Sequence, residues 1–177
     1  DGVNKIMSSK KIIISVLSIF LVGGCASGPE WTQISEKDIK PMTYDYNIPN
    51  TNKDVLFKRA RNHFATVYGD SRSVIRVQDE AEGLIIGKGA IDWKLGTDTL
   101  APISCSSSYN IRFIAKDNKA RLQIHLIEGA PVFSQCTGWR LPTVTAYQEI
   151  LKSFNDISAG VESSLKGLSD ESSFKDF

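Results

Sequence analysis

The alternation of apolar and polar residues predicts a strand and then a helix at the start of the folded part of the chain. Met42–Ile48 alternates and carries two tyrosines, which is typical of a strand. Thr51 has the position of a helix N-cap, with Asp54 as its capping-box partner. The apolar residues that then recur at helical spacing are Leu56, Ala60, Phe64 and Val67. Gly69 is expected to end this helix.

The first of two predicted hairpins joins a strand over Ser73–Gln78 to a strand over Leu84–Trp93. Its connection is the charged turn Asp79–Gly83. One register keeps the apolar side chains together on one face of the sheet. In that register Val77 pairs with Ile85 and Ile75 pairs with Gly87. Residues 94–105 are rich in Ser, Thr and Gly, so we expect a long loop there.

The second predicted hairpin turns at Asp117–Asn118. A two-residue turn fixes the register of the flanking strands. It pairs Phe113 with Leu122, Ile111 with Ile124 and Tyr109 with Leu126. All six residues are apolar, so the turn and the alternating pattern agree on one register.

A long amphipathic helix is predicted near the C-terminus. Its apolar stripe consists of Tyr147, Ile150, Leu151, Phe154, Ile157, Val161 and Leu165. Thr145 and Gln148 have the spacing of a capping box. The element order β-α-β-β-β-β-α predicts an α+β domain over residues 42–166, an antiparallel sheet of about five strands with two helices packed on one face. Residues 167–177 are Ser-rich and charged, and are expected to be disordered.

One stretch resembles a known domain family. The sequence VIRVQDEAEGLIIGKG, which follows a short amphipathic helix, is similar to a bacterial domain family of unknown function. That family is assigned a fold like that of the TATA-box-binding protein. The resemblance covers most of residues 42–165 and implies the fold, but no activity and no catalytic residues. A shared fold does not import DNA binding.

The N-terminus has the pattern of an export signal. Lys10 and Lys11 precede the uncharged apolar run Ile12–Val22, which is shorter than the roughly 20 apolar residues that a membrane-spanning helix needs. The sequence LVGGC ending at Cys25 resembles the lipobox of bacterial lipoproteins. The resemblance implies that residues 1–24 are a signal peptide and that Cys25 becomes lipidated. The alternative is an uncleaved anchor helix with an incidental cysteine. Residues 1–6, upstream of Met7, are an expression scar or an upstream start.

Residues 25–41 are predicted to form the lipidated N-terminus and a flexible tether. The segment after Cys25 is polar and shows no sustained period. At full extension, sixteen residues reach roughly 50 Å, which would let the domain stand off the membrane. Trp31 either dips into the membrane interface or docks on the domain. In bacterial lipoproteins, an aspartate directly after the lipidated cysteine resembles an inner-membrane retention signal. This chain has Ala26 at that position, so the resemblance favours the periplasmic side of the outer membrane.

Composition argues against nucleic-acid binding. The chain has 21 basic and 20 acidic residues, a formal net charge of +1. Without residues 1–24, which hold three lysines and one aspartate, the net charge is −1. A near-neutral protein lacks the overall positive field that grips a polyanion. No nucleic-acid partner and no cofactor are expected, and the sequence indicates nothing about oligomeric state.

Two cysteines remain after Cys25, and they form an even pair in an oxidising compartment. Cys105 and Cys136 lie on either side of the second hairpin, in loops predicted to converge at one end of the sheet. A disulfide between them is favoured. Buried free thiols and a thiol nucleophile are the alternatives. A nucleophile needs a base, and neither His63 nor His125 is placed beside these cysteines.

The sheet face away from the helices is a candidate binding surface. By alternation it carries Arg76, Gln78, Lys88, Asp92, Asn110, Arg112, Arg121, Gln123 and His125. Basic residues outnumber acidic ones, and we select Arg76, Lys88, Arg112, Arg121 and His125 as partner-binding residues. The alternative is a solvated antiparallel face, which is common. Gly87 and Gly89 allow either close packing of a helix or a small apolar ligand site.

The sequence therefore favours a membrane-anchored envelope lipoprotein that binds a protein or envelope partner and is not an enzyme. A small-ligand or lipid carrier that uses the interior between sheet and helices is the alternative. We predict no metal site and no catalytic residues. The two histidines lack a metal-binding spacing, and the carboxylates are grouped in a hairpin turn.

Overall fold

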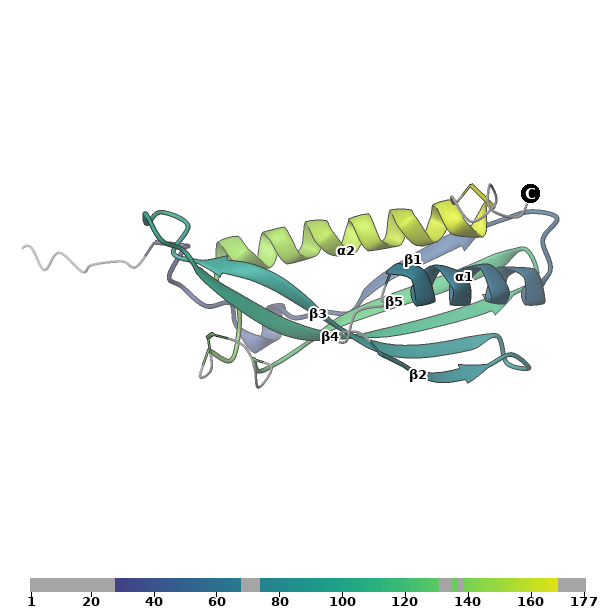
Figure 1. The fold of residues 1–177 in the computed structure, drawn as a ribbon, viewed down its shortest axis with the longest axis horizontal. Coiled ribbons are helices and arrows are strands. Elements are labelled where there is room, and N and C mark those ends of the chain that lie inside the picture. The colour runs from purple at the N-terminus through teal and green to yellow at the C-terminus, as the bar shows by residue number, and fades with distance from the viewer. Residues whose placement is uncertain (1–27, 68–73, 131–134, 137–138, 169–177) are drawn as a thin grey trace, which may run out of the picture.

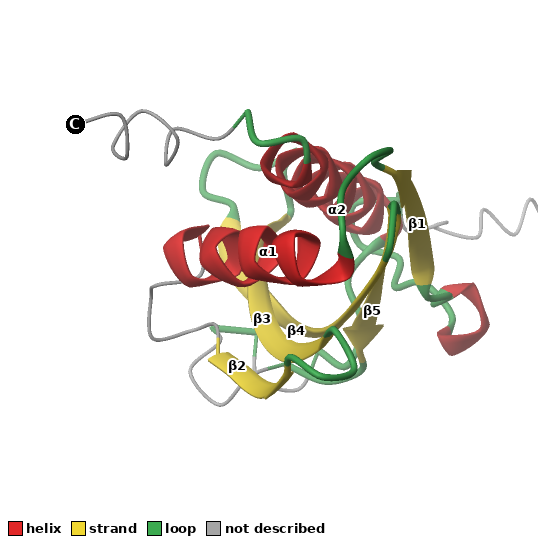
Figure 2. Cartoon of the chain, turned by 90° about the vertical axis from the view of Figure 1, so that its right-hand side faces the viewer, coloured by secondary structure: helices red, strands yellow, loops and turns green. Residues whose placement is uncertain are grey.

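A computed structural model of the chain describes residues 28–67, 74–130, 135–136 and 139–168. Its elements are the 3-10 helix η1 (Glu36–Asp38), β1 (Met42–Asn47), α1 (Lys53–Val67), β2 (Val74–Asp79), β3 (Leu84–Leu95), β4 (Ile103–Lys116), β5 (Lys119–Ile127) and α2 (Val144–Leu165). The five strands form one antiparallel sheet in the order β1-β5-β4-β3-β2. Both helices lie on the same face of this sheet (Figure 1, Figure 2). The predicted α+β architecture is confirmed.

The core lies between the two helices and the covered face of the sheet. Phe64 of α1 meets Phe113 of β4 with ring centroids 6.0 Å apart, and Tyr109 of β4 meets Phe154 of α2 at 5.2 Å. Both pairs have the edge-on geometry that aromatic rings favour. Burial of each such side chain stabilises the fold by about 1.5–3 kcal/mol. These contacts hold both helices against the same central strand, β4.

The second predicted hairpin is confirmed in every pair. The turn at Asp117–Asn118 aligns Phe113 with Leu122, and the register continues through two further pairs. Those pairs are Ile111 with Ile124 and Tyr109 with Leu126. Asn118 has φ +64°, a left-handed conformation that asparagine tolerates in turns. The turn residues and the alternation therefore specify the same register.

The first hairpin differs from the prediction at one residue. Ile75 pairs with Gly87 as expected, but a bulge shifts the next pairs, so Val77 lies opposite Ile86 rather than Ile85. An inserted residue reverses which side chains face the core. Val77 is accordingly 44% exposed instead of buried. Strict alternation in the sequence does not reveal such an insertion.

The loop predicted over 94–105 is much shorter in the structure. Strands β3 and β4 continue to Leu95 and Ile103, which pair with each other. Ser104, the serine of the predicted loop, lies in β4, and nearby in the same strand Ser107 accepts a hydrogen bond from the indole Nε1 of Trp93 at 3.0 Å. A buried serine with a partner is compatible with a strand. Only residues 96–102 connect the two strands.

Both helices begin at residues other than those predicted. The Oδ1 of Asn52, not the side chain of Thr51, accepts from the backbone N–H of Val55 at 2.9 Å. For α2 the N-cap is Thr143, whose Oγ1 accepts from Ala146 at 3.2 Å, so the cap predicted at Thr145 is wrong. In the sequence, Thr51 and the adjacent Asn52 are both acceptable N-cap residues, and so are Thr143 and Thr145. Tertiary contacts decide which one caps the helix.

The predicted flexible tether is wrong over residues 28–41. The backbone N–H of Ile34 donates to Pro142 at 3.0 Å, and the carbonyl of Thr32 accepts from Val144 at 2.8 Å. Ile34 is only 8% exposed, and the hydroxyl of Tyr147 donates to the carbonyl of Asp38 at 3.1 Å. One buried isoleucine and two backbone hydrogen bonds are enough to fix a polar segment whose pattern shows no period.

A disulfide joins Cys105 to Cys136, with their Cα atoms 5.2 Å apart. The pairing agrees with the prediction, although Cys105 lies within β4 opposite Trp93 rather than in a loop. The predictions for the signal peptide, for lipidated Cys25 and for the Gly69 cap lie outside the described residues, as does the predicted disordered tail over 167–177 from residue 169 onward. Its first two residues, Gly167 and Leu168, donate backbone hydrogen bonds to Ser164 and Ser163 at 2.9 and 3.0 Å, so the prediction of disorder is wrong for them.

Candidate functional site

The face of the sheet opposite the helices, here called the open face, is built by alternate residues of β1, β5, β4 and β3. Lys88 lies opposite Asn110, and Asn110 lies opposite His125, so these three residues form one row across the sheet. Asn110 and His125 are exposed, and Lys88 is partly exposed. The predicted placement of Lys88 and His125 on one face is therefore confirmed by the register.

Arg112 lies at the centre of this face. It pairs with Ile86 of β3 on one side and with Gln123 of β5 on the other. The amide of Gln123 donates to the hydroxyl of Thr43 at 3.2 Å, so its hydrogen-bonding group is turned toward β1. Within the described residues Arg112 has no ion-pair partner. Its guanidinium, with a planar fork of donors, is free to bind an incoming carboxylate.

Arg121 differs from Arg112 because it already has an acidic partner. Its Nε donates to Oδ1 of Asp45 at 2.6 Å, and its Nη2 donates to Oδ2 at 2.9 Å. The hydrogen bond from Arg121 lowers the pKa of Asp45 below its usual range. This two-pronged pair crosses from β5 to β1, where the two residues are in register. Arg121 is thus on the predicted face, but its charge is compensated.

Lys116 and Lys119 were missed by the sequence reasoning. They lie directly opposite each other where β4 and β5 meet the turn, on the same face as Arg112 and Arg121. Both are exposed, and neither has an ion-pair partner among the described residues. They border the predicted turn, although extending the alternation by two steps from Arg112 and by one step from Arg121 would have included them. Because they flank the turn, these two lysines were not selected as candidate binding residues.

These lysines border a hollow of about 490 Å³ on the open face. Its lining includes Asp45, Asn47, Ile114, Lys116, Lys119 and Arg121. Three cations and one carboxylate surround a partly buried isoleucine, and the carboxylate is held by Arg121. The hollow therefore offers positive charge at its rim and an apolar contact at Ile114.

Arg76 and Gln78 are displaced from the predicted surface. The bulge between Ile75 and Val77 removes Arg76 from the regular pairing of the edge strand β2. Gln78 lies opposite Ile85, whose side chain is buried on the helix-covered side. The predicted placement of Gln78 is therefore wrong, and Arg76 is exposed at the sheet edge rather than in a row with Lys88. Only part of the predicted surface forms one cluster.

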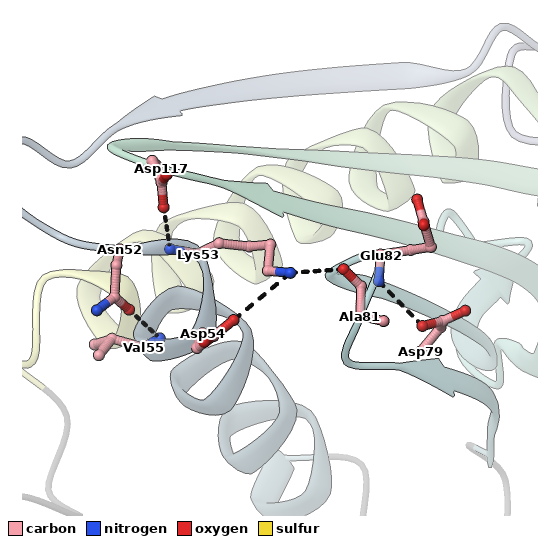
Figure 3. A network of polar contacts seen from close by, with 8 residues as sticks. All are labelled: Asn52, Lys53, Asp54, Val55, Asp79, Ala81, Glu82 and Asp117. Carbon is pink, nitrogen blue, oxygen red and sulfur yellow. Dashed lines mark hydrogen bonds and ion pairs between the residues drawn. The ribbon is translucent and has the colours of Figure 1, made fainter.

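A network of polar contacts fixes the turn that carries the two lysines (Figure 3). The carboxylate of Asp117 accepts from the backbone N–H of Lys53, the first residue of α1, at 2.8 Å. The ammonium of Lys53 donates in turn to the carbonyl of Ala81 in the β2–β3 turn at 2.6 Å. Asn118 donates its backbone N–H to the carbonyl of Thr51 at 2.8 Å. Helix α1 and two hairpin turns thus hold the backbone of Lys116 and Lys119 in place.

The interior beside Gly89 is filled by a side chain. A methyl group at Gly89 would lie 2.3 Å from Cζ of Tyr109, so the tyrosine ring lies directly on the glycine backbone. Tyr109 is 2% exposed and packs against Phe154 of α2. The glycine therefore permits close packing, but of a tyrosine from the neighbouring strand β4 rather than of a helix as predicted.

The titratable groups do not form a catalytic arrangement in the described parts of the chain. His63 lies on α1, where burial lowers its pKa, whereas His125 lies on the open face across the sheet. Cys105 and Cys136 are both oxidised. The described residues include no group of three or more His, Cys, Asp or Glu residues placed to hold a metal ion.

Residues 43–128 match the family described as "Domain of unknown function (DUF4468) with TBP-like fold", where TBP is the TATA-box-binding protein. Residues 43–128 are a DUF4468 domain. The match ends just after β5, so α2 and Cys136 lie outside the matched residues. No curated protein matches this sequence.

Two solved structures share the fold of this DUF4468 domain. A DUF4468 family protein from Bacteroides ovatus has a TM-score of 0.57 and 11% identity, over 78% of this chain and 91% of that one. A TBP-like protein from Parabacteroides distasonis has a TM-score of 0.51 and 13% identity, over 73% and 97%. At these identities the likeness concerns the fold alone. In the described part of the chain, neither helix has the length and apolar character to cross a membrane.

Proposed function

We propose that this chain is a lipid-anchored protein of the bacterial envelope, on the periplasmic side of the outer membrane, whose DUF4468 domain binds an acidic protein segment and catalyses no reaction. The observation that carries the binding proposal is the cluster of Arg112, Lys116 and Lys119 on the open face. These three exposed cations have no ion-pair partner among the described residues. The lipobox-like sequence at Cys25 supports the anchoring part.

The arrangement of the two lysines favours an anionic ligand. Like charges directly opposite each other on neighbouring strands destabilise a sheet. Lys116 and Lys119 are such a pair, and the nearest carboxylate in the hollow, Asp45, is held by Arg121. A carboxylate of the partner placed between the lysines replaces this repulsion with two attractions. The proposed ligand therefore relieves an unfavourable contact of the free protein.

The apolar contact in the hollow favours a protein segment over a uniform polyanion. Ile114 is partly buried, and it lies between Arg121 on β5 and Leu84 on β3. A peptide supplies apolar and acidic side chains a few ångströms apart, so one segment can contact Ile114 and the lysines together. The hollow of about 490 Å³ has room for several side chains. An acidic envelope polymer is the alternative outcome that the experiment must separate.

A photo-crosslinking experiment in living cells tests this proposal. The photoreactive residue p-benzoylphenylalanine replaces Ile114, and irradiation is expected to give a discrete adduct that protease treatment shortens. The double variant Arg112→Glu with Lys119→Glu is expected to lose the adduct. The matched control, Lys58→Glu with Lys152→Glu, reverses two exposed charges on the helices and should keep it. An adduct that survives reversal of Arg112 and Lys119 contradicts the proposal, and a protease-resistant adduct indicates a polymer.

The carrier alternative has no observation in its favour in the described residues. The space over Gly89, where a ligand would have to sit, is occupied by the ring of Tyr109. The hollow of about 490 Å³ lies on the other side of the sheet, at residues such as Ile114 and Lys119. Surface binding is therefore the function that this geometry supports best.

A further inference from the structure

One end of the molecule carries exposed apolar side chains on the connection between β3 and β4. Leu100 is fully exposed at 107%, and Ile103 is 43% exposed. Trp31, from the N-terminal segment, is 41% exposed at the same place. We call these three residues the apolar tip. Figure 1 shows the 96–102 loop at the left end of the sheet, with the beginning of the described chain beside it.

The N-terminal segment is attached to this loop by specific contacts. The indole of Trp31 packs on Gly96, where a methyl group would lie 2.7 Å from Cζ2 of the ring. Gly96 has φ +70°, so both the backbone conformation and the close approach require glycine. The indole Nε1 donates to Asp98 at 3.4 Å, and the hydroxyl of Thr97 donates to the carboxylate of Glu30. The start of the described chain is therefore fixed to the loop rather than free to swing away.

This attachment limits how far the apolar tip can lie from Cys25. Cys25 precedes Gly28 by three residues, which span at most about 10 Å. The backbone N–H of Trp31 donates to the carbonyl of Gly28 at 2.9 Å, so Gly28 itself belongs to the turn that holds the indole. Acyl chains on Cys25 would thus enter a bilayer within a short distance of Leu100.

We infer that the apolar tip is a membrane-contact surface, in which Leu100, Ile103 and Trp31 insert into the lipid surface beside the anchor. This inference rests on the proposed anchoring at Cys25. Indoles favour the boundary between lipid and water, and a leucine exposed on a loop loses contact with water when it enters the acyl region. Because the anchor supplies a high local concentration, a small apolar contact that is weak by itself becomes occupied.

The inferred orientation explains why the open-face hollow is at the other end of the molecule. Strand β4 runs from Ile103 at the tip to Lys116 at the hollow, a length of roughly 40 Å. With the tip in the bilayer, Lys116 and Lys119 face the aqueous compartment. The described charged residues closest in sequence to Trp31, Leu100 and Ile103 are Glu30, Asp98 and Lys94, which carry no net positive charge, so we do not infer attraction to anionic lipid. The contact is apolar and should form equally on zwitterionic lipid.

Fluorescence quenching in reconstituted vesicles tests the inference. Ala101→Cys places a reactive thiol between Leu100 and Ile103 without removing either residue, and an environment-sensitive NBD dye is attached to it. In the lipidated protein no other thiol reacts, because Cys25 carries lipid and Cys105 is bonded to Cys136. The control label is at Glu82→Cys, in the exposed β2–β3 turn at the opposite end. The vesicles are phosphatidylcholine, with or without phosphatidylglycerol, and contain lipids brominated on their acyl chains.

The expected result is quenching of the dye at position 101 by at least twofold, with little quenching at position 82, in both lipid mixtures. Leu100→Ser with Ile103→Ser in the Ala101→Cys background should abolish the quenching while the protein still floats with the vesicles. Equal exposure of the two dyes on protein that floats with vesicles overturns the membrane contact and leaves the anchor intact. Protein that does not float, and whose Cys25 reacts with the dye before any substitution, overturns both proposals.

Discussion

Arg121 donates two hydrogen bonds to Asp45 across neighbouring strands, at 2.6 and 2.9 Å, and so removes its own charge from the set available to a partner. Arg112 lies on β4, on the same face of the sheet as Arg121. It has no such acidic partner among the described residues. Two arginines that alternation places on one surface are therefore not equivalent. One belongs to the sheet, and the other is available for binding.

Asp45→Asn should strengthen partner binding with little effect on stability. The substitution releases the guanidinium of Arg121 into the hollow, which then holds three uncompensated cations. Exposed ion pairs contribute little to folding, so the urea midpoint should stay close to that of the wild type. The measurement is the crosslink yield at Ile114, with Asp156→Asn on the exposed side of α2 as the control. An unchanged or lower yield for Asp45→Asn would count against the role given to this pair.

Gly89→Ala should destabilise the domain by about 1–3 kcal/mol, because the added methyl group overlaps the ring of Tyr109 in a packed core. Gly28→Ala is the matched control, since a methyl group there meets no atom within 4 Å. Urea unfolding measures both. In a Tyr109→Leu background the cost of Gly89→Ala should shrink, because the clashing ring is absent. The same cost in both backgrounds would show that the ring is not what excludes the methyl group.

Loss of the disulfide should lower the free energy of unfolding by roughly 3–4 kcal/mol, the chain-entropy value for a closed loop of about 30 residues. The variant is Cys105→Ala with Cys136→Ala, and the measurement is the urea midpoint with and without dithiothreitol. The reductant should lower the stability of the wild type toward that of the variant and leave the variant unchanged. A wild type insensitive to complete reduction would contradict this stabilising role.

Stability should fall as the pH drops below about 6.5, the ordinary pKa of histidine, and His63 should cause part of that fall. Burial lowers the pKa of His63 in the folded state, so the unfolded chain binds a proton more readily. The stability that comes from burying unprotonated His63 is fully present above the unfolded-state pKa of this histidine. It is lost as the pH falls through that value toward the folded-state pKa. His63→Gln should reduce the slope of unfolding free energy between pH 7.5 and 5. A slope for His63→Gln equal to that of the wild type would contradict this role of His63.

The sequence predicted those parts of the fold where two independent local signals agree. The β4–β5 hairpin is such a case, because the Asp117–Asn118 turn and the alternation around Phe113 demand one register. The bulge in β2 has no such signal, and it moved Val77 out of the core. Helix caps failed for a related reason, since Thr143 and Thr145 are both acceptable caps and only packing distinguishes them.

The candidate site was only partly predictable, because charge pairing is a tertiary property. Alternation correctly placed Lys88, Arg112 and Arg121 on one face. It did not show that Asp45 of a distant strand neutralises Arg121, since β1 and β5 become neighbours only in the folded sheet. The sequence also did not show that the segment around Ile34 packs on the domain, because its partner Pro142 is distant in sequence and becomes a neighbour only in the folded chain.

The proposed anchoring and the inferred membrane contact both depend on one proposed modification, the acylation of Cys25, and an intact-mass measurement tests it most directly. Protein extracted with detergent from the membranes of its native cells should have a mass that begins at Cys25 and includes diacylglycerol, with a third acyl chain where the new amine is also modified. A chain that retains the residues before Cys25, with an unmodified thiol, would contradict the anchoring, the proposed compartment and the membrane contact of Leu100 together.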